Sequence, residues 1–221
     1  MKNEAVVFMN LIEAYFTEYM PYVLGLSDNT VRSYRDTFRI LFNYLYSEKN
    51  IQAGKISFKL LNYENITSFL NWIGNERGCS VSTRNQRLAA LSSFAVYAGG
   101  RNFEAASVFM NSLNKIPKKK MPRPLRTIFT VDEVSCLLRM PDISTNTGKR
   151  DHALLSLMYA SGARAQEMCD LRARDVLFLG DTAKIIITGK GGKARRIIIP
   201  KSCAGILKQY MLWKGVTACP V

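Results

Sequence analysis

The stretch Ser161-Gly162-Ala163-Arg164-Ala165-Gln166-Glu167-Met168-Cys169-Asp170-Leu171 is the most informative part of this sequence. A turn of small residues leads to Arg164 at the start of a helix, and Glu167 follows one helical turn later on the same side. The guanidinium of an arginine is a planar fork of N–H donors that fits phosphate oxygens. An arginine after a glycine turn is more often a structural ion-pair partner, so other segments must decide between the two interpretations.

A second segment, Ile187-Thr188-Gly189-Lys190-Gly191-Gly192-Lys193, supplies a lysine in a glycine-rich setting. It lies between two isoleucine-rich runs, 183–188 and 196–199, and this pattern predicts a β-hairpin. The lysine ammonium is a mobile point charge that can donate a proton. Such a lysine is usually only solvated, but together with Arg164 it would provide the two kinds of charge that phosphate chemistry needs.

The charge of the chain points to a polyanionic partner. Residues 1–124 hold 16 Lys and Arg against 9 Asp and Glu, and residues 125–221 hold 15 against 8, so each half contributes +7 to the net +14. Because the excess is not a basic tail, it fits a protein that grips nucleic acid from two sides. The alternative is a basic protein with no nucleic-acid partner.

Several other classes of protein are disfavoured by the composition. The five cysteines are odd in number and contain no C-x-x-C pair, so neither a zinc site nor a disulfide framework is expected. We also expect no signal peptide and no membrane-spanning segment. These features predict a cytoplasmic protein with reduced thiols.

The first half of the chain has the periodicity of helices. Ser27 or Asp28 can cap one of them, and Ser82 can cap another that carries Leu88 and Leu91 inward. Arg84 and Arg87 are expected on the outward face of this second helix. We predict an all-helical domain in the first half.

A segment rich in proline and lysine follows the helices. Three prolines in residues 115–124 keep it extended, so we predict three parts of the chain: a helical domain at 1–114, a linker at 115–124 and a second domain at 125–221. The exposed lysines Lys118, Lys119 and Lys120 would either follow a phosphate backbone or keep the linker soluble.

The second half combines helices with the hairpin. Thr130-Val131-Asp132-Glu133 is a capping box, and helices are expected near 149–159 and 202–213. The predicted fold class is therefore mainly α, with a partial α+β second domain that contains a small antiparallel sheet.

The order of these features resembles the tyrosine recombinase (phage integrase, XerC/XerD-like) family. The matching pattern is an apolar helix, a T/S-G-x-R turn and E-x-x-x-L-x-x-x-D-[IV], followed by the lysine hairpin. The resemblance implies that Arg164 binds the scissile phosphate, that Glu167 holds its guanidinium, and that Lys190 donates a proton to the 5′-hydroxyl leaving group. Lys193 is then a DNA backbone contact. His152 precedes Arg164, unlike the family's catalytic histidines, so a structural role is expected for it.

The first half resembles the SAM-like core-binding domain of the same family. The matching segments are Asp28-Asn29-Thr30-Val31-Arg32-Ser33-Tyr34-Arg35 and Val81-Ser82-Thr83-Arg84-Asn85-Gln86-Arg87-Leu88. In that family the two corresponding helices lie against the major groove, which implies DNA contacts for Arg32, Arg84, Asn85 and Arg87. Charged helix faces are otherwise usually only solvated.

The resemblance also sets expectations for activity. The family's His-x-x-Arg box, its second His or Trp and its tyrosine nucleophile follow the last helix seen here, and Tyr210 is the one tyrosine after Arg164. We therefore expect the chain to correspond to a C-terminally truncated member that does not cleave DNA alone. The implied function is site-specific recombination of double-stranded DNA at the nucleoid, without metal or cofactor, with self-association on DNA as a tetramer in the full-length family.

Two other functions stay open at this point. The first is a non-catalytic DNA-binding protein that occupies a recombination site. The second is an RNA-binding helical protein, which is disfavoured because no strand carries an aromatic platform for stacking bases.

Overall fold

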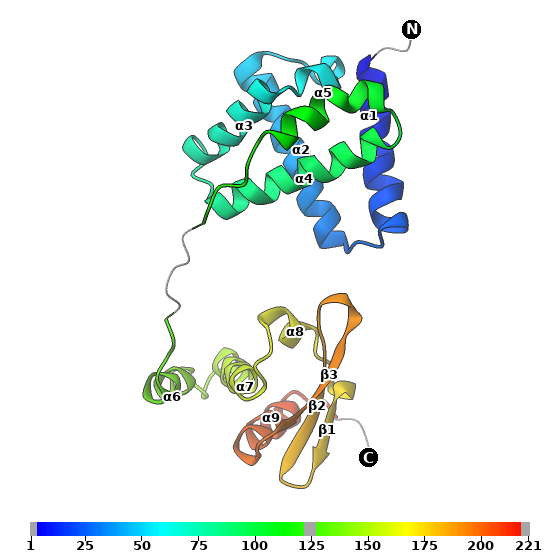
Figure 1. Cartoon of the computed structure of the whole chain (residues 1–221). Helices are drawn as coiled ribbons and strands as arrows, with labels where there is room; N and C mark the ends of the chain where they lie inside the picture. Colours follow the sequence, from blue (N-terminus) through cyan, green and yellow to red (C-terminus); the bar gives the residue numbers. More distant parts are fainter. Residues whose placement is uncertain (1–3, 122–126, 218–221) are drawn as a thin grey trace. The chain divides into compact units, whose positions relative to one another are not determined.

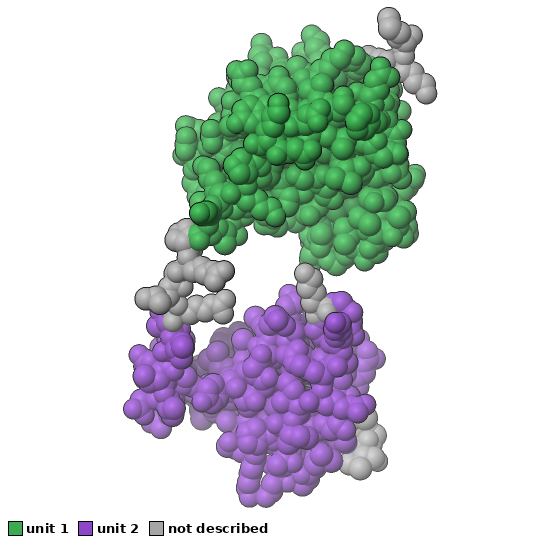
Figure 2. Space-filling view, viewed as in Figure 1, with its two compact units in different colours: residues 1–124 green, residues 125–221 purple. Residues whose placement is uncertain are grey.

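The computed structural model describes residues 4–121 and 127–217, apart from the side chain of Lys190. The chain divides into two compact units, residues 1–124 and residues 125–221 (Figure 2). Each unit has its own apolar core, one all helical and the other built from helices and a sheet. The expectation of a mainly helical chain with a small antiparallel sheet is thus confirmed.

The described part of the first unit contains five α-helices (Figure 1). They are α1 (Glu4–Ala14), α2 (Asp28–Lys49), α3 (Tyr63–Asn75), α4 (Val81–Gly99) and α5 (Phe103–Asn114). A π-helix, Tyr15–Val23, continues α1, and two single 3-10 turns, Ala53–Lys55 and Phe58–Leu60, precede α3.

Aromatic rings fill the centre of the first unit. The Phe94 ring of α4 lies 5.1 Å from that of Phe38, 5.3 Å from that of Tyr15 and 5.9 Å from that of Phe8, measured between centroids. These edge-on contacts bring α1, the π-helix and α2 against α4. The Tyr15 hydroxyl donates to Ser93 Oγ at 2.8 Å, and burial raises the pKa of Tyr15 to about 12.

Helix α4 differs from the sequence expectation in two ways. Its N-cap is Ser80, whose side chain accepts a hydrogen bond from Thr83 N, so the predicted cap at Ser82 is wrong. Arg84 was expected to point outward but is buried, with 6% of its surface exposed. The reason is its position four and seven residues before Leu88 and Leu91, which places it on the same inward stripe of the helix.

The second unit packs helices on one face of a three-stranded antiparallel sheet of order β1-β2-β3 (Figure 1). Its elements are α6 (Val131–Arg139), α7 (Asn146–Ser161), α8 (Ala165–Asp170), β1 (Val176–Leu179), β2 (Thr182–Thr188), β3 (Ala194–Ile199) and α9 (Lys201–Trp213), with 3-10 turns at Ala173–Asp175 and Lys190–Gly192. The capping box predicted at Thr130 is confirmed, since Thr130 N donates to Glu133 Oε2 at 2.7 Å and Glu133 N donates to Thr130 Oγ1 at 3.3 Å.

Alternation along the strands decides which side chains face the core of the second unit. Ala183, Ile185 and Ile187 of β2 are buried, and their register partners on β3 are Ile199, Ile197 and Arg195. The inner face of β3 thus carries two isoleucines followed by an arginine near the hairpin. Helices α7 and α9 add Leu157 and Leu207 to this core.

Candidate phosphate site and nucleic-acid interface

The turn that presents Arg164 is built from the three residues before it. Gly162 ends α7 in the left-handed conformation with φ of 60°, which a glycine adopts without steric cost, and its N–H donates to Met158 O at 2.9 Å. Ala163 is buried in the core of the second unit. Arg164 is therefore placed at the start of α8 by a buried neighbour, while its own side chain is 77% exposed.

Glu167 lies one turn into α8 and is saturated with hydrogen bonds. Its Oε1 accepts from Arg164 Nη1 at 2.9 Å and from Arg195 Nη1 at 3.1 Å. Its Oε2 accepts from Arg195 Nη2 at 2.7 Å and from the backbone N of Arg164 at 2.9 Å. The bonds from Arg195, followed by those from Arg164, lower the pKa of Glu167 to about 2, so it is a carboxylate at neutral pH.

Arg195 is the residue of this cluster that the sequence interpretation missed. It comes from β3, and it pairs with Glu167 in the two-pronged geometry that favours arginine over lysine. The alternation of residues 195–199 could have predicted its inward position, because it places Arg195 on the same face of the strand as Ile197 and Ile199. The identity of its partner could not be predicted, because Glu167 lies 28 residues away in the chain.

The cluster has the charge and the exposure of an anion site. Two guanidinium groups surround one carboxylate, which leaves one net positive charge. Within the described ranges, the guanidinium of Arg164 makes one hydrogen bond, to Glu167, so most of its N–H donors face solvent. The hydrogen bond between Arg164 and Glu167 is present, whereas the supporting role of Glu167 and the binding of a phosphate at Arg164 stay predictions.

The hairpin after β2 contains the predicted lysines. The turn Lys190–Gly192 joins β2 to β3, with φ of 77° at Gly191 and 73° at Gly192, and Gly189 N donates to Lys193 O at 2.8 Å. The side chain of Lys190 lies outside the described part of the chain. Lys193 is exposed at the end of the turn. Proton donation by Lys190 and a backbone contact by Lys193 therefore stay predictions.

His152 and Tyr210 lie elsewhere in the second unit. Both line a hollow of 210 Å³ between α7 and α9, together with Trp213. Both side chains are half-buried, and the ring of Tyr210 lies 5.8 Å from that of Trp213. This placement fits the structural roles expected for the two residues.

In the first unit, the N-terminal halves of α2 and α4 lie side by side. Gln86 Nε2 donates to Ser33 Oγ at 2.9 Å, and Arg87 Nη1 donates to Thr37 Oγ1 at 3.4 Å. Arg32 is exposed on α2, one residue before Ser33, and Arg87 is half-buried at the seam. Two of the four predicted DNA-contacting residues thus lie on neighbouring helices, and their contact with DNA stays a prediction.

The other two predicted DNA contacts, Arg84 and Asn85, hold the linker. Asn85 Nδ2 donates to Lys119 O at 2.8 Å, and Lys119 N donates to Asn85 Oδ1 at 3.0 Å. Arg84 Nη1 donates to Pro117 O at 2.9 Å, and burial lowers the pKa of Arg84. A direct DNA contact by Arg84 stays a prediction that its burial disfavours.

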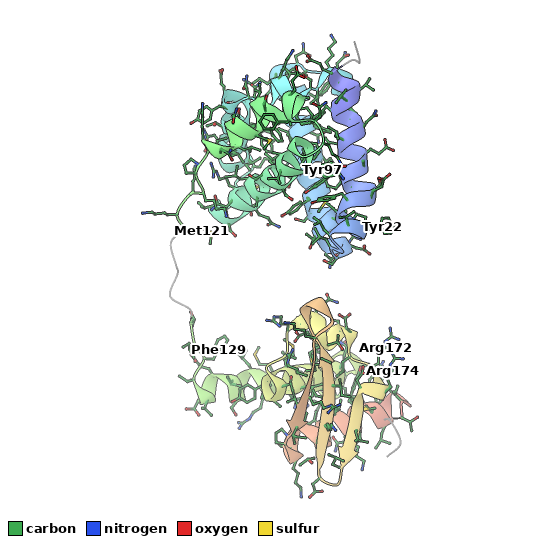
Figure 3. All side chains as sticks on the ribbon, turned by 45° about the vertical axis from the view of Figure 1, so that its right-hand side comes forward. Tyr22, Tyr97, Met121, Phe129, Arg172 and Arg174 are labelled. Carbon is green, nitrogen blue, oxygen red and sulfur yellow. The ribbon has the colours of Figure 1, made fainter. Side chains whose placement is uncertain are left out.

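The linker lysines extend from this attachment. Lys118, Lys119 and Lys120 are exposed, and Met121 is the last residue described before 122–126 (Figure 3). The remainder of the predicted linker, up to Pro124, lies outside the described residues. The side chains of the three lysines are therefore displayed by a backbone that α4 holds at Pro117 and Lys119.

The described ranges contain neither a cluster of metal-binding side chains nor a helix that could span a membrane. No group of three or more His, Cys, Asp or Glu side chains in residues 4–121 and 127–217 is arranged to hold a metal ion. No helix in the same ranges has the length and apolar character needed to cross a membrane.

Comparisons with known proteins agree on one family for both units. The sequence profile of the phage integrase family matches residues 127–217, and that of the phage integrase N-terminal SAM-like domain matches residues 12–103. The chain is similar in fold to the XerH site-specific recombinase bound to its difH substrate, with a TM-score of 0.61 and 19% identity, over 84% of this chain and 53% of that one.

Relatives by sequence extend over most of the chain. A protein of Sinorhizobium fredii described as an integrase/recombinase, y4rC, is 35% identical over 91% of this chain and 60% of its own length. Tyrosine recombinase XerC of Myxococcus xanthus is 29% identical over 86% of this chain and 59% of its own length. The chain thus spans about three fifths of these two relatives, and it belongs to the phage integrase family of tyrosine recombinases.

Proposed function

We propose that this chain binds double-stranded DNA and holds a backbone phosphate at Arg164 for strand cleavage and rejoining in site-specific recombination. The observation that carries the proposal is the cluster of Arg164, Glu167 and Arg195. It fixes one guanidinium through a buried carboxylate, leaves that guanidinium exposed, and keeps a net positive charge. A preorganised donor of this kind stabilises the charge that develops on a phosphate during transfer.

The proposed step is a displacement at phosphorus. An attacking hydroxyl loses its proton to solvent and forms the new ester bond, the bond to the 5′ oxygen breaks, and Lys190 gives that oxygen a proton. Arg164 stabilises the negative charge on the non-bridging oxygens. In the family that the chain belongs to, the attacking group is a tyrosine, and we do not propose Tyr210 for it, because that side chain is half-buried against Trp213.

The first unit would hold the duplex. Arg32 on α2, Arg87 on α4 and the linker lysines lie along neighbouring elements, since α2 contacts α4 and α4 holds the linker. We propose that this surface contacts phosphates and that Asn85 acts by positioning the linker. The XerH recombinase structures contain a bound difH substrate, which supports a DNA partner for this chain. Self-association on DNA is proposed only by analogy with the family.

The test measures DNA binding by fluorescence anisotropy with duplexes of random sequence. Arg164→Ala should weaken binding by about tenfold, because it removes charge-assisted hydrogen bonds to a phosphate. The matched control is Lys201→Ala, which removes one exposed charge at the opposite end of β3 and should weaken binding by less than about threefold. Equal affinities of the wild type and Arg164→Ala would contradict a phosphate site at this position.

A second measurement separates strand transfer from binding alone. A nicked duplex that releases a short fragment on cleavage traps a covalent protein–DNA adduct, which is detected on a denaturing gel. In a chain extended by a segment that carries the family's tyrosine nucleophile, an adduct that forms about 10²–10³-fold more slowly with Arg164→Ala would support phosphoryl transfer. Residues 1–221 alone should form no adduct, and Arg164-dependent binding without any adduct in the extended chain would identify a non-catalytic DNA-binding protein instead.

A further inference from the structure

Arg195 occupies an unusual place for a charged residue. It is on the inner face of β3, directly opposite the buried Ile187 of β2, and 38% of its side chain is exposed. A guanidinium in this position loses part of its hydration and needs a partner. Its two N–H groups donate in parallel to the two oxygens of Glu167, at 3.1 and 2.7 Å.

The hairpin that carries Lys190 rests directly against this ion pair. A Cβ atom added to Gly189 would lie 3.0 Å from Glu167 Oε1 and 3.5 Å from Arg195 Nη1. A side chain at position 189 would require the Glu167 carboxylate to move by a few tenths of an ångström. Gly189 also closes the hairpin by donating to Lys193 O, so the start of the turn and the ion pair are positioned together.

The charges of the cluster depend on both arginines. If Glu167 were paired with Arg164 alone, the negative charge of the carboxylate would cancel the positive charge of Arg164 that attracts a phosphate. Because Arg195 takes two of the four hydrogen bonds to Glu167, the carboxylate is neutralised by a residue of the sheet. The positive charge of Arg164 is then not cancelled. The same carboxylate still accepts hydrogen bonds from the backbone N and from Nη1 of Arg164.

We propose that Arg195 is a positioning residue that fixes the Glu167 carboxylate between the Arg164 turn and the backbone of the hairpin at Gly189, so that Glu167 does not cancel the positive charge that Arg164 offers to a phosphate. The inference rests on the proposed function for the identity of that phosphate. The contacts that carry it lie entirely within the second unit.

The first measurement needs no DNA. Carboxyl NMR titration of the wild type and of Arg195→Gln, with Glu167→Gln for assignment, reports the pKa of Glu167. This pKa should rise in Arg195→Gln, and the backbone amide signals of 190–193 should shift. Arg196→Gln is the matched control, because Arg196 is the exposed, outward-facing neighbour on the same strand, and it should leave both readouts unchanged. An unchanged pKa and unchanged hairpin signals in Arg195→Gln would overturn the proposal.

The second measurement asks whether Arg164 depends on Arg195. Arg164→Ala is introduced into the wild type and into Arg195→Gln, and DNA affinity is compared in a double-mutant cycle. The loss caused by Arg164→Ala should fall from about tenfold in the wild type to less than about threefold in Arg195→Gln. Equal losses in both backgrounds would show that Arg195 has only a structural role.

Conservative variants keep the test decisive if Arg195→Gln folds poorly. Arg195→Lys retains the charge but cannot form two parallel hydrogen bonds. It should therefore restore the stability of the protein more fully than it restores the dependence of DNA affinity on Arg164. Complete rescue of that dependence by lysine would contradict the positioning role. If the wild type bound no DNA, the proposed function would fail, and the pKa and hairpin readouts would still decide the role of Arg195.

Discussion

Single residues of the second unit show how buried charge is arranged at the candidate site. Glu167 is 7% exposed and accepts hydrogen bonds from two arginines and one backbone N–H. These contacts favour its ionised form, and they hold its pKa at about 2, below the ordinary value of 4.5. The protonation of this one carboxyl group therefore couples the stability of the second unit to pH.

The sign of this coupling gives a testable prediction. Because the folded-state pKa is lowered, the stabilisation from Glu167 is present above the unfolded-state pKa of about 4.5 and is lost as the pH falls towards about 2. The difference in free energy of unfolding between the wild type and Glu167→Gln should therefore be largest above about pH 5 and shrink at lower pH. Urea denaturation followed by circular dichroism measures it. A difference that is constant from neutral to acidic pH would contradict the assignment.

The helices and strands of this chain begin and end at local sequence signals. Both the start of α4 and the face on which Arg84 lies differ from the prediction. Two serines precede the apolar stripe, and the one at position 80 accepts the capping bond. The helix therefore starts earlier than expected. The inward stripe, counted back from Leu88 and Leu91, includes Arg84.

The two serines allow a direct comparison. Ser80→Ala should destabilise the first unit by about 1 kcal/mol, because it removes the acceptor for Thr83 N. Ser82→Ala, on the exposed surface of the first turn, should change stability by less than about 0.5 kcal/mol. Thermal unfolding of the two variants provides the measurement, and a larger loss for Ser82→Ala would place the cap where the sequence alone suggested.

The attachment of the linker to α4 is a second property of elements. Asn85→Ala removes both hydrogen bonds to the backbone of Lys119, so the Lys119 amide should exchange with deuterium faster and proteolysis after Lys118–Lys120 should accelerate. Gln86→Ala, one residue along the same helix, removes a contact to Ser33 instead and should leave linker cleavage unchanged. Equal cleavage of Asn85→Ala and the wild type would argue against the attachment.

At the scale of the whole molecule, the net charge of +14 is divided equally between two units that each have their own core. Their candidate DNA-binding groups are of different kinds. The first unit offers the exposed Arg32 on α2, the half-buried Arg87 on α4 and the exposed linker lysines, whereas the second offers one fixed guanidinium and the lysines of the hairpin. Binding to duplex DNA should accordingly be dominated by phosphate contacts and depend strongly on salt.

The salt dependence can be assigned to particular residues. Some six phosphate contacts predict a slope of about −5 in a plot of log affinity against log salt concentration. Replacing Lys118, Lys119 and Lys120 by glutamine should reduce the magnitude of this slope by up to about 3 if all three contact phosphates. A flat salt dependence of the wild type would exclude electrostatic DNA binding. An unchanged slope in the triple variant would indicate that the three lysines only keep the linker soluble.

Local sequence determined the features that depend on backbone preference and near neighbours. The glycine turn before Arg164, the capping box at Thr130 and the hairpin around Lys190 all follow from conformational preferences within a few residues. The bond between Glu167 and Arg164 belongs to the same class, because one helical turn separates the two side chains.

Only the tertiary structure decided which distant acceptor each partly buried arginine contacts. Arg195 reaches Glu167 across 28 residues, and Arg84 reaches Pro117 across 33. Periodicity could have placed both arginines on inward faces, but it could not name their acceptors, because these depend on how β3 packs beside α8 and how the linker returns over α4. The physical reason is that a partly buried arginine must find an acceptor, and the packing of elements far apart in sequence determines which acceptor is within reach.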